Sequence, residues 1–137
     1  MYKAIVIGGF REDSGDVDAP IGRHPVDRKR MAIVPDGRTA RTHWEVLERL
    51  RGAALIQARL TTGRTHQIRV HMASIGHPVL GDPLYGPKRS PYPVTGGQLL
   101  HAWRIGFDHP VTGQRMEFEA EPEERFNRWL EKLRPGG

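Results

Sequence analysis

The chain of 137 residues has the length of one ordinary domain. Its composition, 37% hydrophobic and 27% charged, is typical of a globular protein and argues against an intrinsically disordered chain. The absence of cysteine excludes disulfides, thiolate metal sites and cysteine nucleophiles, and it fits the reducing cytoplasm, where we expect this protein. The apolar runs are short, so we expect no membrane-spanning segment.

Positive charge is concentrated in the middle of the chain. Lys and Arg together number 21 against 16 Asp and Glu, a net charge of +5. Residues 51–90 hold six cations and one carboxylate, a surplus equal to the whole net charge. Such a window predicts a polyanionic partner, most often nucleic acid. A basic solvated face without a partner is the alternative, and charge alone does not separate the two.

Strand patterns dominate the first sixty residues. The first run (YKAIVIGG) is β-branched and apolar, as in a buried strand. The segment around Trp44 fits a strand or a helix, and its Thr-His-Trp triplet favours the strand. A turn at Arg51 and Gly52 would join it to an antiparallel partner. The predicted strands cover residues 2–9, 30–34, 39–50 and 54–60, with loops around one short strand at 11–25.

The clearest helix covers residues 65–75, because Ile68, Met72 and Ile75 recur at helical spacing. Its start can be capped by the hydroxyl of one of the threonines at positions 62 and 65. We therefore expect an amphipathic helix directly after the strand that ends near residue 60.

The last third of the chain begins with a loop at residues 81–97 that contains four Gly and four Pro. Two strands, 98–108 and 115–120, follow with a turn at 109–113. A second amphipathic helix is expected at 122–133, with an apolar side formed by Phe126, Trp129, Leu130 and Leu133. The sum is an α+β fold, a mainly antiparallel mixed sheet with two amphipathic helices.

The segment 62–71 (TGRTHQIRVH) carries the strongest chemical signal. It runs from the end of a strand into a helix, whose N-terminus attracts anions through free N–H groups and its dipole. Gly63 permits close approach of the backbone, and the Arg64 guanidinium can hold a carboxylate bidentately. The pattern predicts an anion site, with an ordinary capped helix whose arginines face water as the alternative.

Seven histidines do not make a metal site here. His66 and His71 are five residues apart, which does not place both on one helical face, and neither an HExxH motif nor a carboxylate lies in that segment. We therefore expect no metal. Asp82 could be a catalytic carboxylate, but its turn-rich surroundings favour hydrogen bonds to its own backbone.

The stretch GRTHQIRVHMASIGHPVLGDPLYG at residues 63–86 resembles the signature of the RluA/RluD-type pseudouridine synthases, which isomerise uridine in ribosomal or transfer RNA. Residues 2–8 resemble the tyrosine-bearing strand of that family. The resemblance continues through IGRHP and RMAI to LHA near the end, so it covers nearly the whole chain.

The resemblance implies roles for particular residues. Arg64 would form the salt bridge that holds the catalytic aspartate, and Tyr2 would stack on the flipped uracil and could take its C5 proton. The reaction breaks the N1–C1′ bond and joins C5 to C1′ without a cofactor or a metal. The candidate phosphate contacts, each with a solvent-facing alternative, are His66, Arg69, His71, Lys88 and Arg89.

One part of the family pattern is missing. The nucleophilic aspartate of the family lies in an H-R-L-D-x-x-T-S-G motif upstream of the tyrosine strand, and the 137 residues contain no such motif. We expect residues 1–137 to be the C-terminal portion of a pseudouridine synthase catalytic domain, inactive without the upstream half. A non-catalytic RNA-binding fragment is the alternative, and a piece that folds only with a partner is a third.

Overall fold

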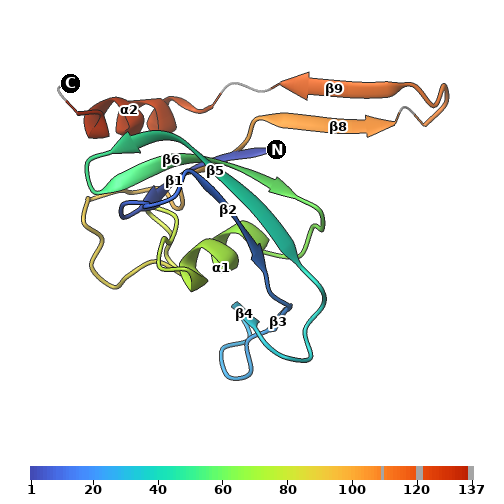
Figure 1. Cartoon of the computed structure of the whole chain (residues 1–137), viewed down its shortest axis with the longest axis horizontal. Helices are drawn as coiled ribbons and strands as arrows, with labels where there is room; N and C mark the ends of the chain where they lie inside the picture. The colour runs from blue at the N-terminus through green and yellow to red at the C-terminus, as the bar shows by residue number, and fades with distance from the viewer. Residues whose placement is uncertain (109, 120–121, 136–137) are drawn as a thin grey trace.

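The fold is built on one five-stranded antiparallel sheet with two small hairpins and two helices (Figure 1). The structure, a computed structural model, describes residues 1–108, 110–119 and 122–135. The large sheet has the strand order β2-β5-β6-β1-β7, and the pairs β3–β4 and β8–β9 form separate two-stranded sheets. The elements are β1 (Tyr2–Ile7), β2 (Ser14–Asp18), β3 (Ile21–Arg23), β4 (Met31–Ile33), β5 (Arg41–Leu50), β6 (Ala53–Leu60), α1 (Gln67–Ser74), β7 (Leu100–Ala102), β8 (Arg104–Asp108), β9 (Arg115–Glu119) and α2 (Glu124–Leu133).

Strand β1 lies in the interior of the sheet, because its residues are apolar on both faces. It pairs with β6 along its whole length and with β7 over its first three residues. Strands β5 and β6 form the predicted hairpin, and Gly52 takes the left-handed conformation that its turn requires. The predicted β1, β5 and β6 strands are therefore confirmed.

The two helices lie on opposite faces of the sheet, with α1 below it and α2 above it in Figure 1. Side chains alternate along β1 to serve both layers. Ala4 and Val6 pack with Met72 of α1, whereas Ile5 packs with Phe126 and other residues of the α2 layer. The sheet is thus a central layer between two apolar cores.

Two predictions about the strands were wrong. The loop-rich stretch 11–25 contains two strands, β2 and β3, in different sheets. The single strand expected at 98–108 is divided into β7 and β8, also in different sheets. Strand β7 pairs with β1 as far as Ala102, and the Trp103 amide donates to the Met1 carbonyl (3.1 Å) just beyond it, whereas β8 pairs with β9. Of the turn predicted at 109–113, residue 109 lies outside the described residues.

Helix α1 also differs from its prediction. It begins at Gln67, and its N-cap residue is His66, with no side-chain cap from either threonine. Ile68 and Met72 are buried as expected, but Ile75 follows the helix and is 39% exposed. The polar residues of this helix between positions 67 and 71 are buried as well. Their partners form the site described below.

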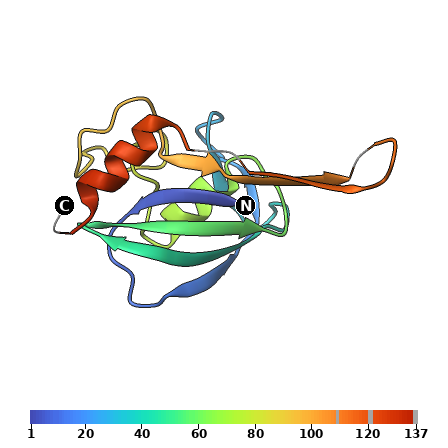
Figure 2. The ribbon, with the colours of Figure 1, turned by 90° about the horizontal axis from the view of Figure 1, so that it is seen from above.

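The β8–β9 hairpin extends away from the large sheet, as Figure 2 shows from above. Within the described part of the chain, neither helix has the length and apolar character that crossing a bilayer requires.

Candidate active site

The segment between β6 and α1 is held in place by one glutamine side chain. Gln67 Oε1 accepts hydrogen bonds from the Thr62 hydroxyl (2.8 Å) and the Arg64 amide (3.0 Å). Its Nε2 donates to the Arg41 carbonyl (2.8 Å) and to Thr42 Oγ1 (3.1 Å). All four hydrogen bonds of this buried amide are made, so the turn that carries Arg64 is tied to β5.

His66 occupies a strained position at the start of α1. With φ of 56°, it is the one non-glycine residue in the left-handed region among the residues that the structure describes. Its Nδ1 shares a 2.8 Å hydrogen bond with the Tyr85 hydroxyl, which also accepts from the Met31 amide at 2.8 Å. Burial, and then the charge of Arg69, lower the pKa of His66, so its ring is neutral at pH 7. Strain of this kind is held by surrounding contacts and clusters at functional sites.

A buried ion pair joins α1 to the loop that follows it. Arg69 Nε and Nη2 donate to the two oxygens of Asp82 at 2.7 and 2.8 Å. Asp82 Oδ1 also accepts from the Leu84 and Tyr85 amides. Burial raises the pKa of the Asp82 carboxyl, but the Arg69 bonds and the backbone donors outweigh it, and the net pKa is below the ordinary value. The expected turn role of Asp82 is confirmed, with an ion pair added.

His71 is the centre of a second buried chain of hydrogen bonds. Its Nε2 lies 2.9 Å from the Ala19 carbonyl, which can only accept, so Nε2 carries the proton. Its Nδ1 therefore accepts from the Thr42 hydroxyl at 2.8 Å. Burial lowers the pKa of His71, in agreement with a neutral ring. This histidine links α1 to β5 and to the segment between β2 and β3.

A cavity of about 240 Å³ lies beside these hydrogen-bonded groups, on the α1 face of the sheet. Its walls are formed by Tyr2, Leu60, Arg64, His66, Gln67, Ile68, Arg69, Gln98 and Leu100. Tyr2 is fixed by strand pairing on both sides, opposite Ala58 in β6 and Ala102 in β7. Arg64 is oriented by the bond from its Nε to the Thr39 carbonyl (2.8 Å). The cavity thus combines an aromatic ring, apolar walls and a guanidinium.

Comparison with known proteins identifies the family. A family model described as RNA pseudouridylate synthase matches residues 1–74 of the chain. The chain belongs to the RNA pseudouridylate synthase family. The α+β fold predicted from the strand and helix patterns is confirmed by solved pseudouridylate synthase domains. The human RNA pseudouridylate synthase domain containing 1 protein superposes with a TM-score of 0.78 at 27% identity, over 88% of this chain and 53% of its own.

Several similar curated proteins come from bacteria. The uncharacterized RNA pseudouridine synthase YlyB of Bacillus subtilis is 49% identical over 99% of the chain, which covers 44% of that protein. The ribosomal large subunit pseudouridine synthase D of Nitrosomonas europaea is 51% identical over 87% of the chain and 36% of its own length. The chain therefore spans less than half the length of these relatives.

The structure brings some of the predicted site residues together and separates others. Tyr2, Arg64, His66 and Arg69 all line the cavity. Arg69 is bonded to Asp82 and mostly buried, and its contact with RNA phosphate stays a prediction.

Three further residues that were predicted to contact RNA lie away from the cavity. His71 is 0% exposed and bonded at both nitrogens, and its contact with RNA phosphate likewise stays a prediction. Lys88 and Arg89 are exposed in the loop after α1 but do not line the cavity. Whether they touch RNA stays a prediction.

Sequence reasoning missed two supporting residues of the candidate site. Gln67 and Tyr85 were not singled out, although the first holds the Arg64 turn and the second holds His66. The Arg69–Asp82 pair had a signal in the sequence, because Asp82 is the one carboxylate in the basic window of residues 51–90. Among the described residues no group of three or more metal-ligating side chains occurs.

Proposed function

We propose that this chain supplies the Tyr2 and Arg64 part of the active site of an enzyme that isomerises uridine to pseudouridine in RNA. The observation that carries the proposal is the shared cavity, which joins an aromatic ring from β1 to a guanidinium at the start of α1. The matched family and the name of the Nitrosomonas europaea relative support large-subunit ribosomal RNA as the substrate. We expect the enzyme to act in the cytoplasm and to need no cofactor.

Arg64 is suited to hold a carboxylate that enters the cavity. Its Nε is occupied by the Thr39 carbonyl, so the two Nη groups remain as donors with a fixed orientation. Across the described residues no carboxylate lies within ion-pair distance of Arg64. We propose that the partner is the nucleophilic aspartate of the H-R-L-D motif, supplied from outside these 137 residues. The guanidinium would keep that aspartate ionised and aimed at the substrate.

Tyr2 is suited to receive the uracil. Its ring shares the cavity with Leu60, Ile68 and Leu100, which provide apolar contact for a planar base. A uridine must leave its stack to reach such a pocket, at a cost of a few kcal/mol. In the proposed reaction the N1–C1′ bond breaks, the base turns, and C5 bonds to C1′. The proton on C5 is lost, for which Tyr2 is the proposed acceptor, and N1 regains a proton.

The test is release of tritium from RNA that carries 5-tritiated uridine. We expect no release by the chain alone, and release when a fragment bearing the H-R-L-D motif is added. In that reconstituted enzyme, Arg64→Gln should lower turnover at least a hundredfold and RNA affinity less than threefold, because it acts on the aspartate. Arg59→Gln, an exposed arginine on β6, is the matched control.

Two outcomes would contradict the proposal. Release by the repurified chain alone would place a nucleophile within these residues. Equal losses of turnover and affinity in Arg64→Gln would make Arg64 a phosphate contact and favour the non-catalytic RNA-binding reading.

A further inference from the structure

The ring of His66 presents one unpaired N–H group at the cavity wall. Its Nδ1 lies 2.8 Å from the Tyr85 hydroxyl oxygen, to which the Met31 amide also donates at 2.8 Å. If Nδ1 carried the ring proton, it would donate to Tyr85 as well, and the hydroxyl proton of that buried tyrosine would have no acceptor among the described residues. Tyr85 therefore donates to Nδ1. Since the ring is neutral, its proton is on Nε2.

The ring is held in place by its backbone and by Tyr85. The left-handed backbone of His66, at φ 56°, sets the direction of the side chain. The Tyr85 ring lies edge-on to the imidazole, with 5.6 Å between the centroids and 77° between the planes. The Tyr85 hydroxyl occupies Nδ1, so Nε2 remains for the cavity, and no described residue accepts its proton. A donor that is oriented in advance needs no reorganisation during the reaction.

Other polar side chains on the cavity wall are already engaged or are not held in one direction. Gln67 makes all four of its hydrogen bonds to the protein, and Arg69 is in the buried ion pair. Arg64 holds the aspartate in the function proposed above. Gln98 is a further amide on the wall, but no hydrogen bond to a described residue orients its side chain. His66 thus supplies a neutral donor with a fixed direction.

The proposed reaction develops negative charge on the base. When the N1–C1′ bond breaks, its electron pair stays with the uracil, and the resulting anion shares its charge among N1, O2 and O4. A hydrogen bond to O2 or O4 is therefore stronger in this state than in the bound uridine, which is the condition for lowering a barrier. A neutral imidazole with a lowered pKa can polarise such an oxygen.

We propose that His66 is a further catalytic residue, which donates its Nε2–H to a uracil carbonyl oxygen and stabilises the base as the N1–C1′ bond breaks. The inference rests on the proposed function, because it adds a group to the same site. Two features favour the base over a phosphate as the acceptor. His66 shares the cavity wall with Tyr2, the proposed uracil contact, and its ring has no positive charge to attract a phosphate. The electron pair returns to covalent bonding when C5 joins C1′, C5 loses its proton and N1 gains one, so His66 keeps its own proton throughout.

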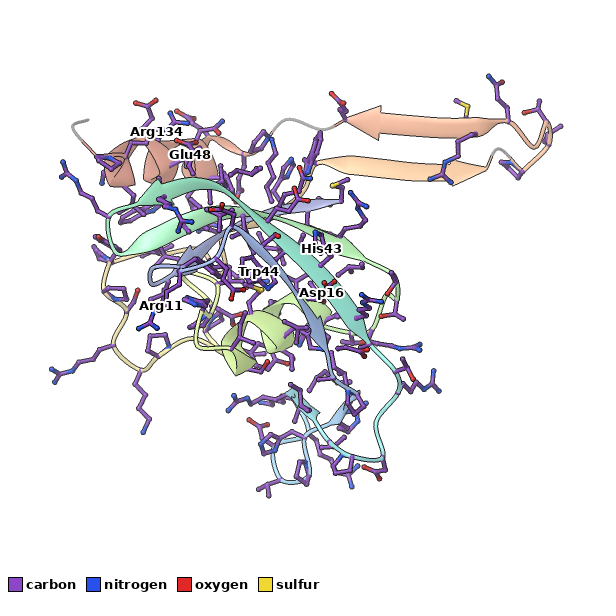
Figure 3. The ribbon with its side chains drawn as sticks, viewed as in Figure 1. Arg11, Asp16, His43, Trp44, Glu48 and Arg134 are labelled. Carbon is purple, nitrogen blue, oxygen red and sulfur yellow. The ribbon has the colours of Figure 1, made fainter. Side chains whose placement is uncertain are left out.

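The test is tritium release from RNA with 5-tritiated uridine, by the full chain with an added fragment that bears the H-R-L-D motif. The variant is His66→Gly, because glycine adopts the left-handed backbone without strain and removes the donor. We expect kcat to fall roughly a hundredfold, as for the loss of one oxyanion-hole donor, and KM to change less than about threefold. His43→Gln is the matched control and should leave kcat unchanged. His43 lies between Thr42 and Trp44, both buried on the α1 face, so its side chain is on the other face of the sheet (Figure 3).

Rescue by small molecules separates a donor from a structural role. Imidazole and 4-methylimidazole carry an N–H group and an acceptor nitrogen, whereas 1-methylimidazole has the acceptor alone at the size of 4-methylimidazole. Added to His66→Gly, the first two should raise kcat at least about tenfold, short of full activity because a free ring loses translational and rotational freedom on binding. The third should have no effect. Circular dichroism checks that each variant is folded.

A second measurement needs no activity. In the isotope-labelled chain at pH 7, nitrogen–proton correlations of the His66 ring should show a protonated Nε2 and a bare Nδ1. A ring protonated at Nδ1, or at both nitrogens, would overturn the inference. An unchanged kcat with a raised KM in His66→Gly, the result for a phosphate contact, would overturn it too, as would equal rescue by 1-methylimidazole. Failure of the unaltered reconstituted enzyme to release tritium would contradict the proposed function, and this inference with it, before any variant is compared.

Discussion

The buried pair between Arg69 and Asp82 makes a sharp prediction about the role of Asp82. Both of its oxygens are bonded to Arg69, one of them also to two amides, and its side chain is 0% exposed. Asp82→Asn keeps an oxygen for the amides but leaves the Arg69 charge buried without a counterion. Removing one partner of a buried ion pair lowers the free energy of unfolding by about 3–5 kcal/mol. The Arg69 side chain is only 9% exposed, so we expect a loss within this range for Asp82→Asn.

The assay is urea unfolding of the full chain at pH 7, followed by circular dichroism. With an m value of about 1.5 kcal/mol/M, the loss shifts the midpoint by about 2–3 M. Asp36→Asn, at an exposed turn position, is the control and should shift it little. Arg69→Met/Asp82→Asn should be more stable than Asp82→Asn, because it removes the unpaired charge.

The reasoning would be refuted by a loss below about 1 kcal/mol in Asp82→Asn, or by a double variant less stable than Asp82→Asn. Either result would mean that Arg69 finds water or another acceptor once Asp82 is neutral.

Three further predictions concern stability. The pKa of His71 is lower in the folded chain, so the unfolded chain binds more protons as the pH falls below about 6.5. His71 should therefore lower the free energy of unfolding by up to ~1.4 kcal/mol at pH 5.5. In melting scans, the melting temperature of His71→Gln should fall less between pH 7.5 and pH 5.5 than that of the unaltered chain. Tyr85→Phe removes a hydroxyl with two hydrogen bonds and should cost about 1–3 kcal/mol in urea unfolding, whereas no change would deny its role in holding the hairpin. Gly37→Ala places a Cβ 2.7 Å from the Ile21 backbone and should lower the melting temperature, while Gly9→Ala, with open space around it, should leave it unchanged.

Local patterns were enough to predict the elements that depend on local sequence. Strand β1 has a run of β-branched residues, and α2 has an apolar side that includes Phe126 and Leu133, both buried. Where the outcome depends on distant contacts, the patterns failed. Strands β7 and β8 lie in different sheets because β7 pairs with β1, about a hundred residues away in the chain, whereas β8 pairs with β9, and nothing near Trp103 signals this change of partner.

The same limit applies to the candidate site. The motif at residues 62–71 pointed to Arg64, whose position depends on the local strand-to-helix turn. It also suggested Arg69 and His71 as phosphate contacts, because a sequence gives the type of a side chain but not its exposure. Their partners, Asp82 and Ala19, lie on other segments. The left-handed backbone of His66 was equally hidden, since the hydroxyl that holds it belongs to Tyr85, 19 residues later.

The position of β1 between β6 and β7 affects the order in which the molecule can assemble. The β5–β6 hairpin is local and can close early, but β1 must wait for partners that begin at Ala53 and end at Ala102. At 5–20 residues per second, a ribosome needs roughly 5–20 s after Tyr2 to reach Leu100, which lines the cavity. Until then one edge of the apolar strand β1 is unpaired, and the nascent chain is most prone to mispairing during this interval. The cavity therefore forms late.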